Sequence, residues 1–175
     1  MEPELPFETE RLLLRPWRVS DAVVSRELWE ERDPRVPPHR RIDADGHPTL
    51  GELEASIRDM SPPDRIGLLV VESRDQGEVL GYCGLILDER FPPDEPEIAF
   101  ELLRRHQGRG IATEAAREVL DWARRSGHPR LWATVRDWNT ASLRVLAKLG
   151  FERTDRLEPD AVHGDTLVLT LGPVR

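Results

Sequence analysis

One short segment combines an apolar strand, a basic turn with two glycines and the start of a helix. It spans residues 100–115, and the glycines are Gly108 and Gly110. Glycine lets the backbone approach a ligand closely, and the first amides of a helix lack partners within the helix and carry partial positive charge. Three arginines lie in the same turn: Arg104, Arg105 and Arg109. These features are typical of a phosphate or pyrophosphate site.

Two nucleotide-binding motifs can be compared with this turn, and neither fits. A Walker A loop requires Gly-Lys-Ser/Thr, whereas Gly108 is followed by Arg109 and Gly110. A dinucleotide fingerprint requires Gly or Ala where Thr113 stands, and belongs early in a βαβ unit. A plain strand-to-helix turn with arginines in solvent remains an alternative, and the glycine pair alone does not decide between it and a ligand site.

The composition limits the class of protein. With 175 residues the chain is long enough for one domain, which we expect to span 1–175. Its 25 basic and 33 acidic residues leave a net charge of −8, which argues against binding to nucleic acid or to anionic membrane. The longest apolar runs are about five residues, far short of the roughly 20 of a membrane span. The acidic N-terminus has no apolar signal region, so we expect a cytoplasmic protein.

Cysteine and histidine usage predicts no metal site. Cys83 is the single cysteine, so a disulfide framework or a Cys-rich zinc site is not expected. The histidines are scattered, without the spacing of a ligand set. They are His39, His47, His106, His128 and His163.

The segment 100–115 belongs to a pattern in which strands precede and follow helices. Apolar runs predict strands at 9–17, 65–73, 78–87, 96–103, 131–135, 151–157 and 163–171. Helical spacing and capping residues predict helices at 22–31, 49–60 (with Thr49 as the cap), 110–126 and 139–149. Residues 33–48, with four prolines, are expected to form a long surface loop. This order predicts an α+β fold in which helices cover a mixed, mostly antiparallel sheet.

Two motifs resemble those of the GNAT superfamily of N-acetyltransferases. Gln107, Gly110 and Ala112 match its Q/R-x-x-G-x-G/A signature. Thirty-two residues after Gln107, Asn139 opens a segment similar to the family's N-x-x-[AS]…K-x-G-F. Residues 8–17 further resemble the opening strand of the Rim-type ribosomal-protein alanine acetyltransferases. The resemblance covers residues 9–171.

The resemblance implies a fold and a co-substrate. The fold is a single α/β/α domain with about four helices and a sheet splayed between its fourth and fifth strands. The co-substrate is acetyl-CoA, with no metal. Residues of the Q-x-x-G-x-A motif would bind its pyrophosphate: Gln107, Gly108, Arg109, Gly110, Ile111, Ala112 and Thr113. Backbone amides in the splay and one helix residue would bind its pantetheine: Phe100, Glu101, Leu102 and Asn139.

The family's reaction is direct transfer of an acetyl group to a primary amine in a ternary complex. Such an amine has a pKa near 10, so only about one molecule in a thousand is neutral at pH 7. A carboxylate that takes the proton removes this obstacle. By resemblance Glu97 is the general base, and Glu101, on the same strand face, is the second choice. Glu97 as a structural carboxylate paired with an arginine remains the alternative.

The general acid departs from the family pattern. Many members carry Tyr seven residues after the asparagine, where this chain has Leu146, and the single tyrosine, Tyr82, lies elsewhere. Ser142, on the same helix, is the candidate donor to the thiolate. Two alternatives stay open, namely that Ser142 only packs the helix and that solvent protonates the thiolate.

The acceptor is expected to meet the first two helices, their loop (residues 20–62) and the last hairpin. Residues 1–65 hold 15 acidic and 10 basic side chains. That excess predicts a cationic amine, such as a protein N-terminus, an aminoglycoside-like compound or a polyamine. Trp29 and Trp138 are candidate pocket walls. A non-catalytic acyl-CoA sensor or interaction module on the same fold is the alternative function, and the chain is expected to be a monomer or homodimer.

Overall fold

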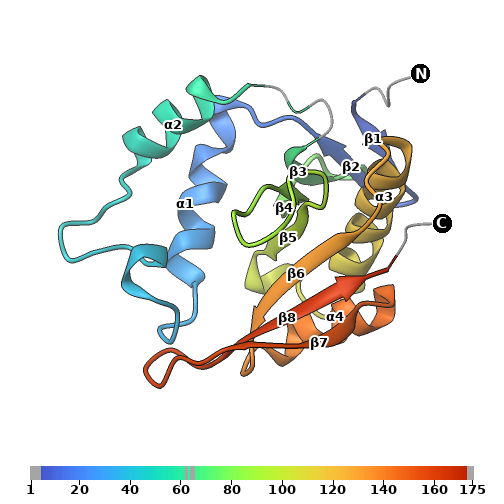
Figure 1. Cartoon of the computed structure of the whole chain (residues 1–175). Helices are drawn as coiled ribbons and strands as arrows, with labels where there is room; N and C mark the ends of the chain where they lie inside the picture. Colours follow the sequence, from blue (N-terminus) through green and yellow to red (C-terminus); the bar gives the residue numbers. More distant parts are fainter. Residues whose placement is uncertain (1–4, 62, 64–65, 173–175) are drawn as a thin grey trace.

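A single eight-stranded sheet organises the chain (Figure 1). The computed structural model describes residues 5–61, 63 and 66–172. The strands are β1 (Phe7–Glu8), β2 (Leu12–Arg15), β3 (Gly67–Ser73), β4 (Val79–Ile86), β5 (Glu97–Leu102), β6 (Leu131–Arg136), β7 (Glu152–Glu158) and β8 (Thr166–Leu171). The α-helices are α1 (Ala22–Glu31), α2 (Leu50–Asp59), α3 (Ile111–Arg125) and α4 (Thr140–Leu149).

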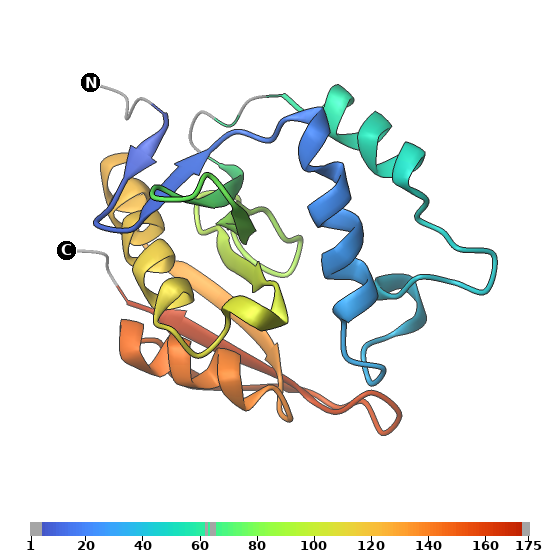
Figure 2. The ribbon, with the colours of Figure 1, turned by 180° about the vertical axis from the view of Figure 1, so that it is seen from behind.

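The strand order in the sheet is β1-β2-β3-β4-β5-β6-β8-β7. Six neighbouring pairs are antiparallel, and β5 with β6 is parallel. Helices α3 and α4 cover one face of the sheet, where the apolar core lies (Figure 2). Helix α1 packs against β4, and α2 packs on α1. The predicted α+β class with a mixed, mostly antiparallel sheet and four helices is therefore confirmed.

Helix boundaries follow the capping residues closely. Helix α1 has the predicted bounds, and Thr49 caps α2 through a box in which it accepts from the Glu52 N–H and Glu52 accepts from the Thr49 N–H. Helices α3 and α4 are followed by Gly127 and Gly150, both at positive φ. In the part of the chain that the structure describes, no helix is long and apolar enough to cross a membrane.

The N-terminal strand prediction is wrong in detail. In place of one strand over residues 9–17, β1 and β2 form a short hairpin, because the Thr9 N–H donates to the Leu12 carbonyl at 2.9 Å. The Thr9 hydroxyl and the Arg11 N–H both donate to Glu114 of α3, at 2.6 and 3.0 Å. A helix distant in sequence therefore holds the turn. Arg65, where the next strand was expected to begin, lies outside the described residues, as do 1–4 and 173–175 of the predicted domain.

The predicted splay lies between β5 and β6, one strand later in the count because β1 is separate. These two strands share a single residue pair, Glu97 with Trp132. Beyond that pair they diverge, so residues 99–102 have no sheet partner on the β6 side. This gap separates the two halves of the sheet.

A buried ion pair fixes the start of α1 on the sheet. Arg15 of β2 donates to both oxygens of Asp21 at 2.8 and 3.0 Å and to Glu72 of β3 at 2.6 Å. The side chains of Arg15 and Asp21 are each 5% exposed. Asp21 also accepts from the Arg18 N–H at 2.7 Å. One guanidinium group therefore joins two strands to the first turn of the helix.

Replacing Arg15 with methionine removes the cation and leaves Asp21 buried without its partner. We expect the free energy of unfolding to fall by about 3–5 kcal/mol, the usual loss when one member of a buried pair is removed. Urea denaturation followed by circular dichroism measures it. The matched control is Arg124→Ala, which breaks an exposed pair with Asp121 and should cost under about 1 kcal/mol. Equal losses in the two variants would contradict the anchoring role.

Candidate active site

The turn over residues 103–110 leads from β5 into α3 and leaves backbone amides available. Gly108 and Gly110 have φ of 72° and 76°, a region that favours glycine. The first helical hydrogen bond of α3 runs from the Glu114 N–H to the Gly110 carbonyl at 3.0 Å. The N–H groups of residues 111–113 precede that bond, so they have no acceptor within the helix. The amides expected at this position are therefore oriented for an anion at the helix N-terminus.

The arginines of the turn do not act as expected. The Arg104 backbone N–H donates to the Glu31 carboxylate at 2.7 Å and its guanidinium donates to the Glu31 carbonyl, while Arg105 pairs with Glu27 of α1 and with Glu78. These two arginines attach the turn to α1 instead of adding charge to a ligand site. The reason is that the acidic residues Glu27 and Glu31 of α1 lie beside the turn in the fold. No local sequence pattern predicts that contact.

Two other polar side chains of the turn also make internal contacts. The Gln107 side-chain amide donates to the Leu102 carbonyl at 2.9 Å and so holds the turn against the end of β5. His106 is buried and bonds Glu78 at 3.0 Å, while an Arg109 nitrogen lies 3.5 Å from the other His106 ring nitrogen. Gln107 and Arg109 therefore shape the turn through these contacts.

A surface groove of about 420 Å³ begins at the helix N-terminus and runs beside α3 and the end of α4. Its lining is Glu10, Arg11, Gly110, Thr113, Glu114, Arg117 and Lys148. Sequence reasoning missed Arg117, although it lies four residues after Thr113 and so on the same side of the helix. The groove places cationic side chains beside the unpartnered amides.

The edge of β5 supplies a second set of amides. The Leu103 N–H donates to the Leu80 carbonyl of β4 at 2.9 Å, and backbone groups alternate in direction along an antiparallel strand. By this alternation Phe100 and Leu102 direct their N–H groups into the gap beside β6. Glu101 directs its N–H toward β4, so of the three residues expected to offer amides here, two do so.

Glu97 lies at the point where β5 and β6 diverge. Its Oε1 accepts from the Thr134 N–H at 2.9 Å and from the Thr134 hydroxyl at 2.5 Å, in place of a backbone acceptor on β5. The side chain is 7% exposed. Burial raises the pKa of the Glu97 carboxyl above its usual value, against the Thr134 hydrogen bonds. The carboxyl group thus ends the pairing of β5 with β6 through Oε1. Its second oxygen, Oε2, takes no part in that contact.

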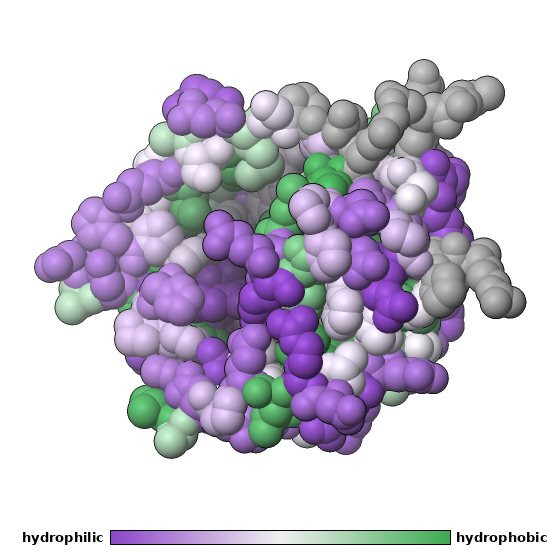
Figure 3. Space-filling model, in the orientation of Figure 1, coloured by the Kyte–Doolittle hydropathy of each residue, from purple (hydrophilic) through white to green (hydrophobic). Residues whose placement is uncertain are grey.

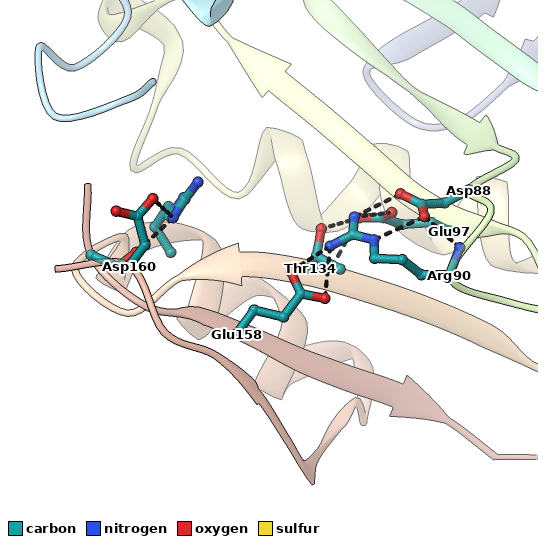
Figure 4. Close-up of polar contacts among 8 residues, drawn as sticks. Asp88, Arg90, Glu97, Thr134, Glu158 and Asp160 are labelled. Carbon is teal, nitrogen blue, oxygen red and sulfur yellow. Dashed lines mark hydrogen bonds and ion pairs between the residues drawn. The ribbon is translucent and has the colours of Figure 1, made fainter. Parts of the chain in front are cut away.

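The second oxygen faces Arg90, from the loop between β4 and β5 (Figure 4). The Arg90 Nη2 lies 3.7 Å from Glu97 Oε2, and the same guanidinium pairs with Asp88 at 2.6 Å and Glu158 of β7 at 3.0 Å. The hydrogen bonds of Arg90 go to Asp88 and Glu158, so its contact with Glu97 is a longer ion pair. Sequence reasoning anticipated an arginine only in general terms and missed Thr134.

Glu101, the second choice for a base, is occupied by other contacts. Arg32 at the end of α1 donates to both of its oxygens at 3.0 and 2.9 Å, and the Tyr82 hydroxyl donates at 2.9 Å. Arg32 also stacks on Trp29 at 4.0 Å. Figure 3 shows the surface hollowed between the α1 side of the molecule and the central strands, with many hydrophilic residues along the hollow. This cluster joins α1 to β5 across that region.

The residues at the start of α4 have structural roles. The Asn139 Oδ1 accepts from the Ser142 N–H at 3.2 Å, so Asn139 is the N-cap of the helix and keeps its amide nitrogen for another partner. Ser142 is partly buried, and Leu146 is buried in the core. Trp138 donates to the His163 carbonyl at 2.7 Å and lies under Arg35 at 4.2 Å. The structure thus joins the α1–α2 loop to the start of α4.

Comparison with known families decides the identity. The family model of the acetyltransferase (GNAT) domain matches residues 11–152, which include β5, the 103–110 turn and helices α3 and α4. The chain belongs to the GNAT family of acetyltransferases. It is therefore an acyltransferase, and the resemblance seen in its motifs is confirmed.

Individual relatives of this GNAT acetyltransferase agree with the family model. The uncharacterized N-acetyltransferase p20 of Bacillus licheniformis is 30% identical over 83% of this chain and 81% of its own. The N-alpha-acetyltransferase RimI of Mycobacterium tuberculosis is 36% identical over 47% of this chain and 51% of its own. The structure of yncA from Salmonella typhimurium, solved with its cofactor acetyl-CoA, has a TM-score of 0.65 and 24% identity, covering 92% of this chain and 93% of its own. The last comparison concerns the fold alone.

The contact between Glu97 and Thr134 generates a stability prediction. Glu97→Ala leaves the Thr134 N–H without its acceptor, and we expect the free energy of unfolding to fall by about 1–3 kcal/mol. Glu97→Gln keeps a carbonyl oxygen for that N–H and should lose clearly less. Urea denaturation at neutral pH compares the two variants. Equal losses of unfolding free energy in the two variants would mean that the hydrogen bond from the Thr134 N–H does not stabilise the fold.

Proposed function

We propose that this GNAT acetyltransferase transfers the acetyl group of acetyl-CoA to a primary amine by direct attack in a ternary complex. The observation that carries the proposal is that one strand, β5, contains both the candidate base and the amides that would bind the donor. The Glu97 carboxyl stands at its start, the free amides of Phe100 and Leu102 at its end, and the 103–110 turn leads directly into the N-terminus of α3.

The donor would bind along the gap and the groove. Its pyrophosphate would accept from the amides of residues 110–113, and the cationic side chains of Arg117 and Lys148 suit its remaining phosphate, whereas Arg11 pairs with Glu114. Its pantetheine would lie in the gap, bonded by the amides of Phe100 and Leu102 and by the side-chain amide of Asn139. The acetyl-CoA in the yncA structure supports this donor.

Glu97 would act as the general base through Oε2. A carboxyl group with a raised pKa is a better proton acceptor near neutral pH than an ordinary one. Because the side chain is 7% exposed, we expect the amine proton to reach it through one water. The neutral amine forms a C–N bond to the thioester carbon, an amide in the gap stabilises the oxyanion, and the C–S bond breaks. The thiolate takes a proton from Ser142 or from solvent.

The acceptor is inferred from charge and relationship. Residues 1–65 carry an acidic excess, and they include the α1 and α2 side of the hollow. The N-alpha-acetyltransferase RimI and the resemblance of residues 8–17 to Rim-type enzymes favour a protein N-terminus. A small-molecule amine remains the second acceptor class. A non-catalytic acyl-CoA sensor would bind the donor without turnover.

Glu97→Gln tests the role of the base. It keeps the acceptor for Thr134, so we expect coenzyme A to bind with unchanged affinity in calorimetry. Release of free thiol with a panel of peptide and small-molecule amines should fall by about 10²–10⁴-fold. The matched control, Glu118→Gln, alters a partly buried carboxylate of α3 that pairs with Arg125 and should keep full activity. Donor binding without turnover in the unmodified protein would instead support the sensor.

The pH dependence of turnover gives an independent test. Glu97 must be ionised to accept a proton, and its pKa is raised by burial. As the pH falls through this raised pKa the base is protonated, so kcat/KM should decline on an acid limb centred above the ordinary carboxyl value of about 4.3. The limb should vanish in Glu97→Gln, leaving a low, flatter profile. A limb at the ordinary value would mean that another carboxylate acts.

A further inference from the structure

We propose that Arg90, fixed by Asp88 and Glu158, is a positioning residue that stabilises the ionised form of Glu97 without donating a hydrogen bond to its Oε2. The inference rests on the proposed function only in assigning the base to Glu97. No sequence motif of the family points to the loop over residues 87–96, so the assignment comes from the geometry in Figure 4.

The guanidinium group of Arg90 is held on two sides. Its Nε and Nη2 donate to the two oxygens of Asp88 at 2.8 and 2.6 Å, and its Nη1 donates to Glu158 at 3.0 Å. Asp88 lies two residues away on the same loop, whereas Glu158 is at the end of β7. A planar group bonded in two directions has little freedom to rotate. The position of the positive charge is therefore set by contacts other than Glu97.

The distance from this charge to Glu97 is the informative quantity. At 3.7 Å between Nη2 and Oε2, the two groups attract each other without a hydrogen bond. Oε1 is already occupied by Thr134, and Oε2 lies beside the Arg90 charge without accepting a hydrogen bond from it. Arg90 thus contributes charge to Glu97 without donating to Oε2. A direct hydrogen bond from Arg90 would compete with the proton that Glu97 has to accept.

The charged groups around Glu97 explain why Arg90 is needed. Asp88 and Arg90 belong to the 87–96 loop, and the neutral Thr134 belongs to β6. Glu158 of β7 contacts Arg90. The bond from Arg90 lowers the pKa of Asp88 to about 2, so Asp88 stays charged at any pH at which Glu97 titrates. Without Arg90, the negative charge of Asp88 would act on Glu97 unopposed and would raise the pKa of its carboxyl group further.

The loop has a second attachment, which makes Arg90 a usable site for substitution. Phe91 is buried and stacks on Trp132 of β6, with ring centroids 4.7 Å apart and planes 5° apart. The Trp132 indole donates to Glu95 at 2.8 Å. These contacts hold both ends of the 90–95 segment, so variants at Arg90 should keep the fold.

The test measures the protonation of Glu97 directly. In protein carrying ¹³C-labelled glutamate, the carboxyl carbon of Glu97 is assigned as the signal missing in Glu97→Gln, and is titrated by NMR. We expect Arg90→Gln to raise the titration midpoint by about one pH unit and Arg90→Lys to raise it much less. The matched control is Arg156→Gln on β7, which removes an arginine that lies over the rings of Phe91 and Trp132. It should leave the midpoint unchanged.

Turnover provides the second readout. With an accepted amine, the acid limb of kcat/KM in Arg90→Gln should move up by the same amount, so activity falls about tenfold below the limb and recovers at high pH. An unmoved NMR midpoint in Arg90→Gln overturns the proposal, whether or not the enzyme turns over. Failure of the proposed function looks different: Glu97→Gln would leave turnover intact, while the NMR titration still reports on Arg90.

Discussion

The structure depends on the divergence of two parallel strands at a buried carboxyl group. The Thr134 N–H, which would continue the ladder between β5 and β6, donates to the Glu97 side chain instead. From that point β5 has an open edge whose amides lack sheet partners. Because the same strand continues into the 103–110 turn and α3, the open edge and the free helix amides form one continuous polar surface. A regular sheet would have consumed these donors.

Placing a carboxyl group at this point has an electrostatic consequence. Burial favours its neutral form and so does the nearby Asp88 carboxylate, so an opposing positive charge is needed to keep it ionised. Arg90 supplies it from a loop that is anchored separately by the stack of Phe91 on Trp132. The two oxygens of Glu97 thus have different partners. Oε1 accepts hydrogen bonds from Thr134, and Oε2 faces the positive charge of Arg90.

Ion pairs also connect the two sides of the site. Helix α1 is fixed to the sheet by Arg15 and Asp21 at its start, and to the 103–110 turn and β5 through Glu27, Glu31 and Arg32 at its end. The helix beside the hollow and the turn beside the donor groove therefore form one connected unit.

The sequence by itself determined most of the elements and the position of the free amides at the start of α3. Capping residues such as Thr49, Asn139 and Gly150 mark helix ends through local hydrogen bonds and backbone conformation, and the Q-x-x-G-x-A motif places free amides at a helix start whatever surrounds it. Only the tertiary structure decided which charges pair. The partners Arg105 with Glu27, Arg32 with Glu101 and Arg90 with Glu97 are brought together by packing. A guanidinium group can pair with any carboxylate within reach, so residue type and local spacing do not specify the choice.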